Sequence, residues 1–151
     1  NTDVYGNFAL AGSIFLDSRN SSTFADVFSL LYGHHMENSQ MFGDLDKYRS
    51  VDFLQQTNTG TLLVPGGRYA LRVFACIVVS ASDDLIYQPL QWQADNVPAM
   101  LDRLQADALC VDQAAMDDLR TAQNLKVLCM STCSSDYTDA RTVVLAAMQL
   151  E

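Results

Sequence analysis

Hydrophobic and polar residues along the chain alternate mainly with the two-residue period of β-strands. Six runs rich in β-branched and apolar residues are separated by clusters of turn-forming residues. These predicted strands cover 12–17, 27–32, 61–64, 68–81, 125–132 and 142–148. The fourth follows the turn Pro65-Gly66-Gly67, and the fifth is apolar on both alternating faces, as is typical of a central strand. The pattern therefore predicts a mostly β fold.

One segment has a clear helical period, at 97–107. Its apolar residues share one helix face, Asp95 or Asn96 can serve as the N-cap, and Pro98 suits the first turn. The apolar set is Val97, Met100, Leu101 and Leu104. A shorter helix is predicted at 41–48, weakened by Gly43, and the alanine pair in 142–148 leaves a helix open there as an alternative. The expected architecture is a β-barrel or sheet with a helical insertion before the strand 125–132.

Composition narrows the class of protein. The 151 residues suit one domain (1–151), and 49% hydrophobic against 18% charged residues favours a compact globule. A net charge of -9 argues against a nucleic-acid partner, which requires clustered Lys and Arg. No apolar run approaches the ~20 residues of a membrane span. The chain shows no signal-peptide pattern and does not begin with Met, so we expect a piece of a longer protein.

Four cysteines lie at positions 76, 110, 129 and 133, with no Cys-x-x-Cys motif. Along an extended strand, the Cα atoms of Cys129 and Cys133 would be ~13 Å apart. A disulfide requires less than ~7 Å. We therefore expect two thiols rather than a bridge.

Three residues combine into a possible acyl-transfer site. His34 follows the strand 27–32, Cys133 ends the central strand, and Arg141 begins the next one after the polar loop 134–140. If those last two strands pair antiparallel, Cys133 and Arg141 meet at one sheet edge. A neighbouring cation favours the nucleophilic thiolate, and a histidine supplies a proton shuttle.

Each of these residues also has a purely structural explanation. A cysteine in an apolar strand is usually a small core residue, and an arginine at a strand end is usually a surface residue. The pair His34-His35 could be part of a metal site, although the cysteines and acids lack a recognised ligand spacing. Spacing alone therefore makes the three residues candidates and does not identify them.

At these residues the sequence resembles the sortases, and class B among them. The family signature Thr-Leu-x-Thr-Cys is similar to 129–133, with Cys129 and Met130 in place of Thr and Leu and with Ser131-Thr132-Cys133 intact. The Cys-to-Arg spacing and the Ala-Arg-x-Val-Val entry to the last strand also resemble class B. So do Tyr-Gly-His-His-Met with Met-Phe-Gly-Asp-Leu (32–36 and 41–45) and Gly-Ser-Ile-Phe-Leu-Asp (12–17). The blocks follow the family's order over most of the chain.

The resemblance implies a cysteine transpeptidase. Cys133 would be the nucleophile, His34 the acid/base and Arg141 the oxyanion partner, while Ser131 and Thr132 would lie by the substrate groove. The enzyme would cleave a C-terminal sorting motif of a surface protein after Thr. It would then transfer the acyl group to an amine of a peptidoglycan precursor or a pilin, with no metal or cofactor. It would work at the extracellular face of a Gram-positive cell. His35 is read as non-catalytic.

The resemblance also implies what this chain lacks. Class B members carry N-terminal helices and a first strand before the element at 12–17, where only eleven residues precede Gly12. We expect an N-terminally truncated sortase-like β-barrel, with its membrane anchor in the absent part. Three alternatives stay open: a plain cysteine hydrolase, a catalytically silent binding barrel and a metal-binding protein. The transpeptidase reading predicts that the Cys133 sulfur, the His34 ring and the Arg141 guanidinium lie within about 4 to 7 Å of each other.

Overall fold

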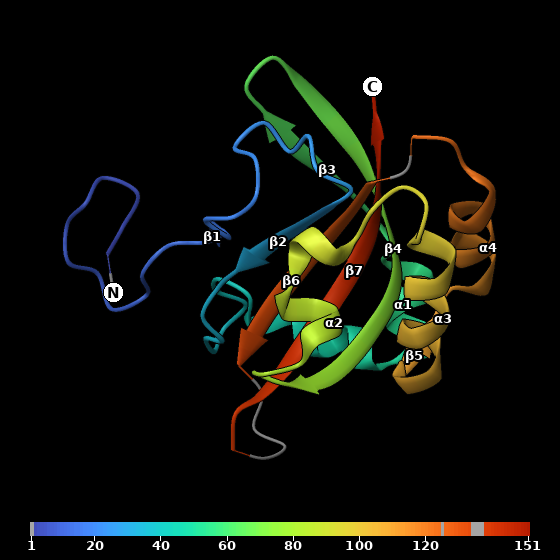
Figure 1. Cartoon of the computed structure of the whole chain (residues 1–151). Coiled ribbons are helices and arrows are strands. Elements are labelled where there is room, and N and C mark those ends of the chain that lie inside the picture. The colour runs from blue at the N-terminus through green and yellow to red at the C-terminus, as the bar shows by residue number, and fades with distance from the viewer. Residues whose placement is uncertain (1, 125, 134–137) are drawn as a thin grey trace.

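A twisted mixed β-sheet forms the centre of the molecule in a computed structural model (Figure 1). The structure describes residues 2–124, 126–133 and 138–151, and only the backbone of Cys133. The strands are β1 (Phe15–Leu16), β2 (Phe28–Tyr32), β3 (Thr59–Val64), β4 (Gly67–Ser80), β5 (Cys110–Val111), β6 (Lys126–Cys133) and β7 (Ala140–Leu150). The helices are α1 (Val51–Gln56), α2 (Asp84–Tyr87), α3 (Val97–Asp107) and α4 (Gln113–Thr121), with two 3₁₀ helices, η1 (Gly43–Arg49) and η2 (Pro89–Gln91).

The order of the described strands is β1-β2-β6-β7-β4-β3, with β5 added to β4. Among the described strand pairs, only β2–β6 is parallel. The mostly β class with a helical insertion is confirmed. The described sheet is not closed into a barrel by hydrogen bonds, because β1 and β3 end the strand order without pairing to each other.

The hairpin β3–β4 follows from its turn residues. Val64 pairs with Gly67, so Pro65 and Gly66 form a two-residue connection. Gly66 has a φ of 87°, which side chains other than glycine rarely adopt. The predicted strand pair and turn are confirmed, and β4 then continues for 14 residues to pair with β7.

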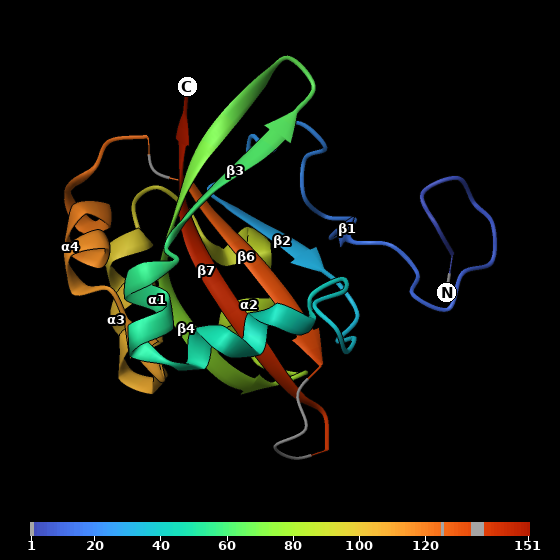
Figure 2. The same cartoon turned by 180° about the vertical axis from the view of Figure 1, so that it is seen from behind.

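The central strand β6 separates two apolar layers. It lies between β2 and β7, and Val127, Leu128 and Cys129 are all at most 1% exposed. Figure 1 shows α2 in front of the sheet, and in the reverse view of Figure 2 the chain through η1 and α1 crosses the other face. The cluster on the first side includes Trp92 and the α3 side chains. We call this the α3 face, and the opposite one, which includes Leu45 and Leu54, the η1 face.

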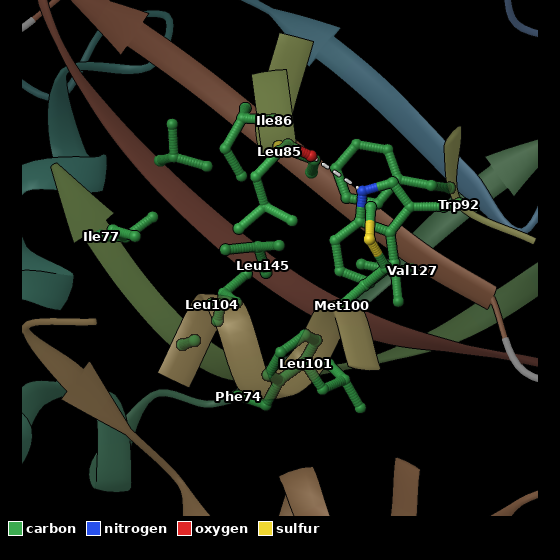
Figure 3. Close-up of a cluster of buried hydrophobic side chains, with 14 of the residues drawn as sticks. Phe74, Ile77, Leu85, Ile86, Trp92, Met100, Leu101, Leu104, Val127 and Leu145 are labelled. Atoms are coloured by element: carbon green, nitrogen blue, oxygen red, sulfur yellow. Dashed lines mark hydrogen bonds between the residues drawn. The ribbon is translucent and has the colours of Figure 1, made fainter. Parts of the chain in front are cut away.

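Helix α3 has the predicted bounds and buries the predicted set, Val97, Met100, Leu101 and Leu104. Asn96 is at the N-cap, but its side chain binds the Gln93 N–H and the Gln91 carbonyl rather than the helix. Figure 3 shows how α3 meets Trp92, whose indole N–H donates to the Leu85 carbonyl oxygen at 2.9 Å. The indole stacks on Phe28 with ring centroids 4.6 Å apart. This packing joins the helical insertion to β2.

Two further elements follow the sequence predictions, and several others differ. The short helix predicted at 41–48 is present as the 3₁₀ helix η1 (Gly43–Arg49), and the segment 142–148 is the predicted strand, within β7, rather than a helix. Only Phe15–Leu16 of the segment 12–17 pairs as a strand. The insertion contains α4 as well as α3, and α1, α2 and β5 were not predicted. Of the predicted loop 134–140, residues 134–137 lie outside the described residues. No helix in the described ranges has the length and apolar character of a membrane span.

Candidate active site

Three strand ends meet at one edge of the sheet. Tyr32, the last residue of β2, pairs with Ser131 of β6, and the N–H of Gly33 donates to the Ser131 carbonyl oxygen at 3.1 Å. Cys133, the last residue of β6, pairs with Arg141 of β7. The antiparallel pairing on which the predicted juxtaposition depends is therefore present. His34 lies two residues beyond the end of β2 at this edge.

Arg141 belongs to the α3 face of the sheet. Side chains alternate along β7, and Val143 and Leu145 pack in the α3-face cluster, so Arg141 points to that side and Thr142 to the other. Its guanidinium Nη1 donates to the Ala140 carbonyl oxygen at 2.9 Å. Burial raises the pKa of the nearby Tyr87 hydroxyl, and the positive charge of Arg141 opposes that rise. The guanidinium thus lies on the same side of the sheet as Tyr87 of α2.

Ser131 and Thr132 are buried residues, each 2% exposed. The Ser131 hydroxyl makes a 2.7 Å hydrogen bond with the Tyr87 hydroxyl on the α3 face. Thr132 points to the opposite face, and its hydroxyl has no hydrogen-bond partner among the described residues. Both residues are closed off from solvent, so their contact with a substrate stays a prediction.

A buried carboxylate connects the strand before His34 to α2. Asp17, 7% exposed, accepts from the Nε and Nη2 of Arg19 and from the Tyr32 hydroxyl, each at 2.8 Å. Arg19 also donates to the Tyr87 carbonyl oxygen at 2.9 Å. Hydrogen bonds from Arg19 hold the pKa of Asp17 well below its usual range. Burial raises the pKa of the Tyr32 hydroxyl, and its hydrogen bond to Asp17 raises it further. Sequence reasoning missed this network, although Asp17 ends a segment already singled out.

The two histidines lie in different surroundings. The Nε2 of His35 is 2.9 Å from the Oδ2 of Asp46 in η1, and the Thr142 hydroxyl donates to the Oδ1 of Asp46 at 2.6 Å. His35 therefore binds on the η1 face, away from Arg141. The exposed His34 is held through its backbone, because its carbonyl oxygen accepts from the Phe42 N–H at 3.0 Å. This arrangement favours His34 over His35 as the partner of Arg141.

The predicted separation of the three side chains stays a prediction, because the side chain of Cys133 lies outside the described part. Cys129 is a free, fully buried thiol on β6, as expected. In the described ranges, no three His, Cys, Asp or Glu side chains gather as metal ligands. A groove of about 570 Å³ lies at the other end of β7, lined by Lys126, Met148 and the end of α4. It does not belong to this site.

Comparisons with known proteins decide the family. No family model matches the chain. Sortase B of Listeria monocytogenes is 31% identical over 140 residues, which cover 90% of this chain and 54% of that protein. Sortase B from the type II pilus of Streptococcus pneumoniae is 33% identical with a TM-score of 0.79, over 99% of this chain and 82% of that one. The chain belongs to the class B sortases.

The fold agreement covers almost the whole of this sortase chain. A Streptococcus pyogenes class B sortase involved in pilus biogenesis aligns with a TM-score of 0.85 and 29% identity, over 99% of this chain and 78% of that one. The chain spans little more than half the length of the curated relatives it matches. The agreement in fold includes the sheet and its insertion, the elements that bring the backbones of His34, Cys133 and Arg141 to one edge.

Proposed function

We propose that this chain is the catalytic part of a cysteine transpeptidase. The observation that carries the proposal is the register at the sheet edge, where Cys133 pairs with Arg141 beside the end of β2 and its following His34. This edge supplies the three groups that acyl transfer requires: a nucleophile, a proton shuttle and a fixed cation. The family membership supports the same assignment.

The proposed reaction has two halves. The Cys133 thiolate attacks the carbonyl carbon of a Thr in the substrate peptide, and Arg141 stabilises the oxyanion that forms. His34 gives its proton to the departing amine, the C–N bond breaks, and a thioester remains on Cys133. An amine then attacks the thioester, loses a proton to His34 and releases the thiolate. The new amide bond carries the acyl group to the acceptor.

The proposed substrate is a C-terminal sorting-motif peptide of a surface protein, which fits the solved complex of Staphylococcus aureus sortase B with its substrate. The proposed acceptor is an amine of a peptidoglycan precursor or a pilin lysine. Two of the similar structures come from pilus systems, by their descriptions. The proposed site of action is the outer face of a Gram-positive cell. Ser131 and Thr132 would lie beside the peptide groove.

The test is mass spectrometry of the chain incubated with a panel of sorting-motif peptides, with and without triglycine as amine acceptor. We expect a thioester on Cys133 and an acceptor-dependent transfer product. Cys133→Ala should abolish both, whereas Cys129→Ala, a cysteine on the same strand, should retain them. Peptide cleavage that ignores the acceptor would indicate a plain hydrolase. Failure to form any thioester across the panel would indicate a silent binding barrel and defeat the proposal.

A further inference from the structure

One carboxylate joins the loop that carries His34 to the strand that carries Arg141. Asp46 accepts the Thr142 hydroxyl at its Oδ1 and contacts the His35 ring at its Oδ2. Thr142 is fully buried, whereas the His35 and Asp46 side chains are 38% and 34% exposed. Residues 35 and 142 lie far apart in the sequence, and Asp46 brings them within one hydrogen-bond chain. This hydrogen-bond chain ends at His35, which is next to His34, and at Thr142, which is next to Arg141.

The loop between β2 and η1 is otherwise folded mainly on itself. The Phe42 N–H binds the His34 carbonyl oxygen, and His35 and Met41 form an isolated β-bridge. Gly43 packs so closely on the Met36 carbonyl that a Cβ would overlap it. These contacts give the loop a fixed internal shape. They do not by themselves set how the loop sits against the sheet.

The loop is joined to the sheet by the buried side chains of Phe42 and Leu45, which pack in the η1-face cluster, and by polar contacts at its two ends. Among the described residues, the Gly33 N–H binds Ser131 of β6 at one end, and the Asp46 carboxylate binds Thr142 of β7 at the other. Because Thr132 pairs with Thr142, the second contact falls one residue before the Cys133–Arg141 pair. A tilt of the loop about its Gly33 end would move the His34 ring relative to both of those residues.

We propose that Asp46 is a positioning residue for the acyl-transfer site, acting through His35 and Thr142 to hold His34 in place. This inference rests on the proposed function. His35 orients the loop and does not itself transfer the proton, since its ring is engaged by Asp46 on the face of the sheet opposite Arg141. A hydrogen-bonded partner that locks an active-site group improves its geometry without touching the substrate.

The test uses the rate at which iodoacetamide alkylates Cys133 at pH 7, read from the Cys133 peptide by mass spectrometry. Thr142→Val keeps the volume of Thr142 and removes its hydroxyl, and Thr142→Ser keeps the hydroxyl. Asp46→Ala removes both contacts, whereas Asp46→Asn retains an acceptor for Thr142 and a donor for His35. We expect Thr142→Val and Asp46→Ala to slow alkylation about tenfold, because the thiolate is the form that reacts and a displaced His34 ring no longer favours it. Thr142→Ser and Asp46→Asn should stay within about twofold of the parent.

Three further variants make the outcome decisive. His35→Ala removes a partly exposed side chain and its contact to Asp46, so it reports on the link even where Thr142→Val fails to fold. The double variant Asp46→Ala/Thr142→Val should be no slower than either single one, because both remove the same link. His34→Ala is the reference. If His34→Ala leaves the alkylation rate of Cys133 unchanged, both the proposed function and the positioning role of Asp46 are overturned. If the alkylation rate depends on His34 but is unchanged by Asp46→Ala and His35→Ala, the positioning role alone is overturned.

Discussion

Replacing Asp17 with Ala is expected to destabilise the whole domain and not only the candidate site. Asp17 accepts three side-chain hydrogen bonds, two from Arg19 and one from the Tyr32 hydroxyl. Removing one partner of a buried ion pair costs about 3–5 kcal/mol, and an exposed pair contributes about 0–1 kcal/mol. Because Arg19 is 41% exposed and regains water, we expect an intermediate loss of about 2–3 kcal/mol in the free energy of unfolding.

The assay is equilibrium urea denaturation followed by Trp92 fluorescence and circular dichroism. At roughly 2–4 °C per kcal/mol for a domain of this size, the midpoint of thermal unfolding should fall by about 4–12 °C. Asp44→Ala is the matched control, because Asp44 and Lys47 form a 3.0 Å pair whose side chains are both about half exposed. The control should leave the unfolding midpoint nearly unchanged, because exposed ion pairs contribute little to stability. Equal losses in the two variants would refute the reasoning.

The Asp17 carboxylate also predicts the direction in which the free energy of unfolding changes with pH. Because Arg19 lowers the pKa of Asp17 in the folded state, its stabilisation is fully present above the unfolded value of about 3.9 and is lost as the pH falls below it. The difference in unfolding free energy between the parent and Asp17→Asn should therefore be constant from pH 7 to about pH 5 and shrink in stronger acid. A difference that grows on acidification would contradict the assigned pKa direction.

Three further predictions follow from burial and backbone geometry. Before denaturation, iodoacetamide should label only Cys133. Burial raises the pKa of the Cys76 thiol to about 12, and the other described cysteines are also buried. Rapid labelling of a second thiol, detected by mass spectrometry, would disprove this. Leu101→Ala should lower the unfolding free energy by about 2–5 kcal/mol in urea titrations, because the side chain is 0% exposed in the core. Gly43→Ala should destabilise by about 1–3 kcal/mol and reduce thioester formation, because its Cβ would overlap the Met36 carbonyl. Gly60→Ala, whose Cβ would meet Leu71 at an ordinary 3.7 Å, should leave both measurements nearly unchanged.

Local sequence patterns were sufficient to predict those elements whose stabilising interactions lie close together in the sequence. The period of Val97, Met100, Leu101 and Leu104 defined α3, because a helix places these positions on one face. Pro65-Gly66 defined the β3–β4 turn, because Gly66 supplies the positive φ. By contrast, α4 and α1 have nine and six residues, and short helices depend on the surface against which they pack. The strand β5 has two residues and exists only through its pairing with β4.

The sequence by itself determined the strands β2, β4 and β6, the helix α3 and the three residues His34, Cys133 and Arg141 as candidates. Only the tertiary structure decided which strands are neighbours, and hence that Cys133 pairs with Arg141 beside the end of β2. It also separated the two histidines, since Asp46 and Thr142 hold His35 on the opposite face of the sheet. Neither the Asp17 network nor the Asp46 link has a local signature. Each joins residues from separate elements, and only the packing of the sheet brings those elements together.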